Sequence, residues 1–169
     1  MLARNSQTGR TGVQTSDLRI AADRDAPALL PPFFLDHPGW VMVRERAAEQ
    51  AGAGSVVYPF TLKGEPYVPA AHPALAASDK AHLCLVAYNL GGDDLAVEGR
   101  VLDAAGRPLP GGKLVVLERP PSVKPEEAKM LATFEPTGLA AGSYVLQVAV
   151  KNPKTGRSDV NSMSFDVTR

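Results

Sequence analysis

The chain has 169 residues with 18 basic and 18 acidic side chains, so its formal net charge is zero. Without a basic field it has no electrostatic attraction for nucleic acid or an anionic membrane surface, and we expect neither partner. The single cysteine, Cys84, excludes an intrachain disulfide. The longest apolar run, residues 26–35, contains three prolines and is too short to span a bilayer.

The N-terminal segment is similar to a segment near the other end of the chain. Residues 4–20 (RNSQTGRTGVQTSDLRI) and residues 151–167 (KNPKTGRSDVNSMSFDV) share five identical and six conservatively exchanged positions out of 17. Internal repetition of this kind indicates an array of similar units. We therefore predict that residues 1–20 are the terminal hairpin of a preceding module of the same type. The alternative is a chance similarity between two Thr-Gly turns.

Residues 21–55 are predicted to be a linker followed by lead-in strands. Residues 21–27 are polar and end in proline, which is typical of a linker. The apolar runs 28–35 and 39–45 come next, and two prolines inside the first run predict an edge strand or an extended lead-in. A helical turn or loose loop is expected over residues 44–54.

Residues 56–169 are predicted to form an Ig-like antiparallel β-sandwich of about seven strands. Apolar or alternating runs are separated by Gly-, Pro- and Asp-rich turns roughly every 8–12 residues, which favours a sandwich over alternating strands and helices. We expect strands over residues 56–63, 80–90, 95–103, 113–118, 128–135, 143–151 and 158–167. Gly91–Asp94 is predicted to be a hairpin turn, and residues 126–129 are a candidate for one helical turn.

The long strand at residues 143–151 is preceded by the pattern of a tyrosine corner. Leu139, Gly142 and Tyr144 have the corresponding spacing, in which a tyrosine hydroxyl near the start of the penultimate strand bonds to upstream backbone. Gly156 follows this strand in the turn to the last strand. We therefore assign structural roles to these four residues.

No group of side chains in the sequence has the spacing of a catalytic or metal site. His82 and Cys84 lie on the same side of a predicted strand, but a nucleophilic pair needs an orienting third group, and a buried structural thiol is the favoured interpretation. The other histidines, His37 and His72, are far apart, and zinc needs three or four ligands. Asp93 is expected to serve the turn and not a calcium ion. We predict no catalytic residue, cofactor or metal.

Aromatic residues are concentrated before the main run of strands. Trp40, Tyr58 and Tyr67 are candidates for a surface that stacks on a sugar or a peptide. The alternative is that these side chains pack the lead-in segment onto the sandwich, and this interpretation is favoured because burial of one aromatic side chain stabilises a fold by roughly 1.5–3 kcal/mol.

The segments LPGGKLVVLERP and LAAGSYVLQVAVKNPKTGRS resemble an Ig-like or fibronectin type III-like module. Together with PFTLKGEPYVPAAHPAL, HLCLVAYNL and AVEGRVLDAAGRPLPG, they are similar to the C-terminal region of bacterial von Willebrand factor A-related proteins of the acidobacterial type. The resemblance implies a secreted or envelope-exposed protein with a metal-binding A domain upstream. The DxSxS motif of that domain is missing from this sequence, so no metal ligand is carried over.

We expect a non-catalytic structural or interaction module of a larger extracytoplasmic bacterial protein. Its expected partners are neighbouring domains of the same protein or other proteins. The extracytoplasmic location rests on the resemblance alone, because residues 1–10 lack the apolar core of a signal peptide. A carbohydrate- or peptide-binding sandwich module and an accessory domain of an upstream hydrolase are the alternatives.

Overall fold

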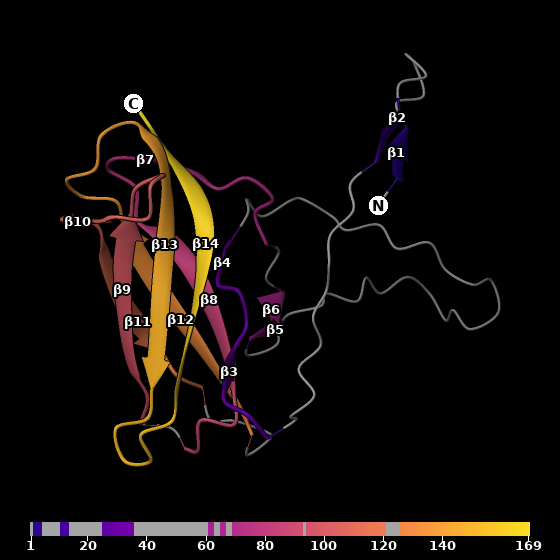
Figure 1. The fold of residues 1–169 in the computed structure, drawn as a ribbon, viewed down its shortest axis with the longest axis vertical. Coiled ribbons are helices and arrows are strands. Elements are labelled where there is room, and N and C mark those ends of the chain that lie inside the picture. Colours follow the sequence, from indigo (N-terminus) through magenta and orange to yellow (C-terminus); the bar gives the residue numbers. More distant parts are fainter. Residues whose placement is uncertain are drawn as a thin grey trace.

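The computed structural model describes residues 2–4, 11–13, 25–35, 61–62, 65–66, 69–92, 94–120 and 126–169. Within these ranges the regular structure consists of strands, and two sheets face each other as a β-sandwich (Figure 1). The all-β sandwich predicted from the sequence is thereby confirmed. The predicted strand at 39–45, the helical turn at 44–54 and most of the predicted strand at 56–63 lie outside the described residues.

The first sheet, here called sheet I, has the strand order β10-β9-β13-β14-β7. Its four neighbouring pairs are antiparallel except β14–β7, which is parallel. The strands are β7 (Ala74–Ala76), β9 (Ala96–Leu102), β10 (Pro108–Leu109), β13 (Gly142–Lys151) and β14 (Ser158–Thr168). The long hairpin β13–β14 forms the centre of this sheet.

The second sheet, sheet II, has the order β11-β12-β8-β3, and β4 also pairs with β8. Its pairs are antiparallel. The strands are β3 (Ala28–Leu29), β4 (Phe33–Phe34), β8 (Ala81–Tyr88), β11 (Lys113–Glu118) and β12 (Glu127–Glu135). The predicted central strand is therefore β8, and the proline-containing run is an edge strand interrupted between its two halves.

Two further short hairpins lie outside these sheets. One pairs β5 (Thr61–Leu62) with β6 (Glu65–Pro66), and the other pairs β1 (Leu2–Arg4) with β2 (Thr11–Val13). In the latter hairpin Arg4 is opposite Thr11. Adding the sequence offset of 147 to both numbers gives Lys151 opposite Ser158, which is the observed register of β13 and β14.

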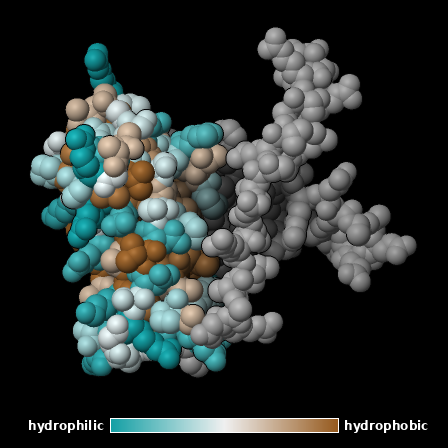
Figure 2. Space-filling view, in the orientation of Figure 1, coloured by the Kyte–Doolittle hydropathy of each residue, from teal (hydrophilic) through white to brown (hydrophobic). Residues whose placement is uncertain are grey.

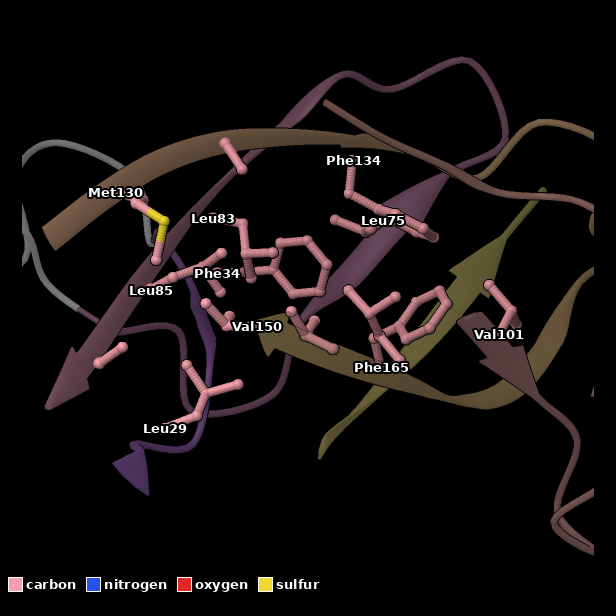
Figure 3. Close-up of a cluster of buried hydrophobic side chains, with 14 of the residues drawn as sticks. Leu29, Phe34, Leu75, Leu83, Leu85, Val101, Met130, Phe134, Val150 and Phe165 are labelled. Atoms are coloured by element: carbon pink, nitrogen blue, oxygen red, sulfur yellow. The ribbon is translucent and has the colours of Figure 1, made fainter. Parts of the chain in front are cut away.

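The core lies between the two sheets and is aromatic at its centre (Figure 3). Phe34 and Phe134 come from sheet II and Phe165 from sheet I, and their three ring centroids are 5.2–6.0 Å apart. Leu83 from β8 and Leu146 from β13 are fully buried beside them. Tilted and edge-on contacts of this kind add about 0.5–1.5 kcal/mol per pair to the effect of burial.

Four details of the topology differ from the sequence prediction. Gly91–Asp94 does not join a hairpin, because β8 pairs with strands of sheet II whereas β9 pairs with strands of sheet I. The residues expected to form a helical turn at 126–129 include the start of β12. The strands β7 and β10 lie in segments predicted to be connections, and the parallel β7–β14 pair makes sheet I mixed.

The strands at the sheet edges carry features that limit pairing with other chains. Pro31 and Pro32 interrupt the β3–β4 edge, and β11 has an irregular register between Val116 and Glu118. The outermost strands of sheet I, β7 and β10, contain only three and two residues. Proline, bulges and short strands are common means of preventing edge-to-edge association.

Gly112 and Gly106 provide a matched pair for testing the core. Both have a positive φ, +74° and +77°, but a Cβ on Gly112 would lie 2.7 Å from Val101 and 2.9 Å from the Phe134 ring, whereas nothing lies within 4 Å of one on Gly106. We expect Gly106→Ala to cost about 1 kcal/mol through backbone strain and Gly112→Ala about 3–4 kcal/mol, because overpacking is added. Urea titration measures both. Equal losses would contradict this account of the core.

Candidate functional site

The tyrosine predicted to form a corner donates a hydrogen bond to upstream backbone. The Tyr144 hydroxyl donates to the Ala140 carbonyl at 2.9 Å, and its ring lies 5.8 Å from that of Phe165. Leu139 is buried in the main core and its backbone N–H donates to Pro136. Gly142 opens β13, and a Cβ there would make only ordinary contacts of 3.6–3.7 Å with the Tyr144 side chain. Sterics therefore do not require glycine at this position.

The corner bond can be tested by removing one oxygen. We expect Tyr144→Phe to lower the free energy of unfolding by about 0.5–1.5 kcal/mol, the net contribution of one hydrogen bond. Tyr88→Phe is the control, because the Tyr88 hydroxyl makes no hydrogen bond within the described ranges. Denaturant titration of both variants measures the difference. A Tyr144→Phe variant as stable as the control would show that the bond does not contribute.

The turn between β13 and β14 is organised by the side chain of Asn152. This side chain is 2% exposed, and its Oδ1 accepts hydrogen bonds from the backbone N–H groups of Lys154 at 2.8 Å and Thr155 at 3.1 Å. Gly156 has φ +74°, and its N–H donates to the Asn152 carbonyl at 2.9 Å. A Cβ on Gly156 would meet nothing within 4 Å. Glycine is therefore favoured there by backbone conformation alone.

The same turn binds the connection between the two sheets. Three side chains donate to three consecutive carbonyls of that connection: Arg157 to Asn89 at 2.9 Å, Thr155 to Leu90 at 3.2 Å, and Asn152 to Gly91. We call these three hydrogen bonds the brace. They join the sheet I hairpin to the end of β8 in sheet II, so they fix this end of the sandwich.

The chain enters the sandwich at the brace and leaves at the opposite end. The Asn89 side chain donates to the Ala26 carbonyl at 3.1 Å, which places the start of the sandwich beside the brace. The last strand, β14, then runs away from the brace, and Thr168 at its far end pairs with Ala76. Figure 1 shows the C-terminus and the β13–β14 turn at opposite ends of the long axis.

None of the three brace residues was singled out by sequence analysis, which named only Gly156 in their turn. The signal that could have found them was the repeat. Four of its five identical positions fall at Asn152, Thr155, Gly156 and Arg157, and these residues either make the brace or shape its turn. Identity between the two segments therefore coincides with the side chains that make specific contacts.

The surface beside the brace carries one exposed ion pair. Lys154 Nζ lies 2.6 Å from Asp94 Oδ2, with both side chains more than 70% exposed. The hydrogen bond and the charge of Lys154 lower the pKa of Asp94, and Asp94 raises the pKa of Lys154 in the same way. Because water screens exposed pairs, this contact contributes little to stability.

The brace predicts unequal effects for two neighbouring substitutions. Asn152→Ala removes two bonds that shape the turn and leaves the Gly91 carbonyl without its donor, so we expect a loss of about 2–3 kcal/mol in the free energy of unfolding. Lys154→Ala, which removes only the exposed ion pair, is expected to change stability little. Thermal and urea unfolding of the two variants make the comparison. Equal stabilities would refute a structural role for the Asn152 side chain.

The side chains considered for chemistry do not form a cluster in the described part of the chain. Cys84 is buried, and burial raises its pKa to about 12, which opposes formation of the nucleophilic thiolate. His72 and His82 are exposed. No group of three or more His, Cys, Asp or Glu side chains among these residues could hold a metal ion.

The predicted ligand-stacking residues, Trp40, Tyr58 and Tyr67, lie outside the described residues, as do His37 and Asp93. Their roles stay predictions. No helix in the described ranges is long and apolar enough to cross a membrane.

Comparison with known proteins gives only distant similarities. No protein-family model and no curated protein matches the sequence. A family 123 glycoside hydrolase from Clostridium perfringens aligns over 58% of this chain and 23% of its own, with 11% identity and a TM-score of 0.41. The ZirS C-terminal domain aligns over 79% of this chain and 97% of its own, with 8% identity and a TM-score of 0.32.

Proposed function

We propose that this protein is a non-catalytic, Ig-like sandwich module that links or supports domains in a larger extracytoplasmic bacterial protein. Its partners would be neighbouring modules of the same protein or other proteins. The extracytoplasmic location and the relation to von Willebrand factor A-related proteins rest on sequence resemblance. The observation that carries the proposal is the shared register of the hairpins β1–β2 and β13–β14.

The strand order supports the Ig-like part of the proposal. Immunoglobulin sandwiches place strands A, B, E and D in one sheet and C, F and G in the other. The same order appears here when strands A to G are assigned, in chain order, to β3/β4, β8, β9, β11, β12, β13 and β14. The Tyr144 bond comes from strand F, as expected for a tyrosine corner. The chain departs from antibody domains in lacking the disulfide and a tryptophan in strand C.

The placement of the two ends supports a linking role. Residues 25–27 enter beside the brace, and β14 carries the chain over eleven residues to the other end. At roughly 3.3 Å per residue this strand alone separates the two ends by about 35 Å. In the proposed array, a neighbour before residue 25 and a neighbour beyond β14 would lie at opposite ends of the sandwich.

The shared hairpin register supports the modular part. In the C-terminal hairpin, the residues identical to Asn5, Thr8 and Arg10 donate the bonds of the brace. A two-stranded hairpin is marginally stable without a sheet to complete it. Residues 2–13 therefore fit the terminal hairpin of a second sandwich that would supply an equivalent of the Asn89–Gly91 carbonyls.

A chimera tests whether the two hairpins are equivalent. Residues 151–167 are replaced by residues 4–20, which puts Leu18 and Ile20 at the core positions of Phe165 and Val167. We expect cooperative unfolding, because the brace residues and the apolar side chains at positions 165 and 167 are retained. The midpoint should lie below that of a Phe165→Leu reference, because Gly12 replaces Asp159, which accepts a hydrogen bond from Leu29, and Ser16 replaces Met163, which packs on the core. A matched chimera carries the same segment shifted by one residue.

The shifted segment would turn its apolar side chains to the outside of the sheet, so that chimera should not fold. Circular dichroism and urea titration distinguish the two. If the aligned and shifted chimeras fail equally while Phe165→Leu folds, the repeat and the modular function proposed from it are wrong. No described contact favours the carbohydrate- or peptide-binding alternative.

A further inference from the structure

The outer faces of the two sheets differ in chemistry. Outward positions of sheet I carry mainly polar side chains: Glu98, Arg100, Gln147, Ser162, Ser164 and Asp166. This face is turned to the viewer in Figure 2, where small hydrophobic patches are separated by hydrophilic ones. On sheet II, the neighbours in sequence of the outward residues point into the core. The outward positions of β4, β8 and β12 carry Phe33, Cys84, Val86 and Leu131.

The outward side chains at the centre of sheet II are buried. Cys84 is 0% exposed, Val86 4% and Leu131 9%, although none of them belongs to the core between the sheets. On the edge strand β11, in contrast, Val115 and Leu117 are 39% and 47% exposed. Burial thus decreases from the β4 side of the face towards β11, as it would beneath a layer that comes from the β4 side.

The chain leaves the sandwich and returns to it at the β4 side. Leu35 and Pro69 form an antiparallel bridge, and the Ala70 N–H donates to the Phe34 carbonyl at 2.8 Å. Leu35 also packs against Cys84 and Leu131 as part of the apolar cluster on the outer face. The 33 residues from 36 to 68 therefore start and finish at the margin of this face.

The sequence of this intervening segment suits an apolar surface. It contains the WVMV run at residues 40–43, with the only tryptophan of the chain, and Tyr58, Phe60 and Tyr67. Side chains of this size stabilise a fold by roughly 1.5–3 kcal/mol each when they leave water. The segment and the face are joined covalently at both ends, so their association costs little translational entropy.

We propose that the outer face of sheet II, formed by Phe33, Leu35, Cys84, Val86 and Leu131, is the docking surface for residues 36–68 of the same chain. The segment makes a third layer over β4, β8 and β12 and stops short of β11. Its aromatic side chains then pack against the sandwich and are not available to stack on a ligand.

The single tryptophan reports on this docking directly. In the full chain we expect acrylamide to quench Trp40 fluorescence several-fold less than in the urea-unfolded chain. Leu131→Asn, on the docking face, should raise the quenching constant at least two-fold. Val145→Asn, at an outward position of the central strand β13 in sheet I, is the matched control and should leave it unchanged. Unprotected Trp40 in the folded chain, or equal responses of the two variants, would overturn the proposal.

The reactivity of Cys84, which lies on the docking face, tests the same contact. Replacing residues 36–68 with a short Gly-Ser linker should leave the amide protection of β13 intact and increase the reaction rate of Cys84 with a thiol reagent at least ten-fold. An unchanged rate in the folded linker variant would overturn the proposal. If that variant does not fold, the Trp40 comparison decides. Sedimentation measures whether the protein self-associates. If Trp40 is protected only when it does, the face would be assigned to a second copy, which would also overturn the proposal.

Discussion

The contact between Phe34, Phe134 and Phe165 is the interaction on which the two-sheet arrangement depends. Phe34 comes from an interrupted edge strand, Phe134 from the centre of sheet II and Phe165 from the last strand of sheet I. Residues more than 130 positions apart therefore meet in one cluster, and the sheets cannot separate without exposing all three rings. The close approach of Gly112 to Phe134 fits the connection before β11 against the same cluster.

Polar contacts hold the two ends of the sandwich together, beyond the apolar core. At the entry end, the brace supplies donors to three consecutive carbonyls of the crossover between the sheets. At the exit end, the Tyr144 hydroxyl holds the approach to β13. The Leu90 and Gly91 carbonyls are part-buried, so donors from Thr155 and Asn152 replace the water that these carbonyls lose. No buried side-chain nitrogen or oxygen of the described residues is left without a partner.

Long strands were predictable from the sequence, but of their pairings only the β13–β14 hairpin was. The alternation in β13 and β14 and the apolar run of β8 identify these strands because the period of two is a local property. The turn at residues 91–94 was assigned to a hairpin because Gly-Gly-Asp-Asp suits any reversal of the chain, and only contacts some 40–60 residues away decide that β9 joins the other sheet. The three-residue β7 is too short for any periodicity to reveal it.

The candidate sites also divide into those encoded by neighbouring residues and those that depend on distant ones. Tyr144 could be found because the corner is encoded within six residues, whereas the brace joins segments about 60 residues apart and appears in the sequence only through its repetition at residues 5–10. Solvent-exposed turns tolerate many sequences, and four of the five identical positions of the repeat lie at residues that make the brace or shape its turn. The short or interrupted edge strands complete this arrangement, because they limit edge-to-edge pairing of the sandwich with other chains.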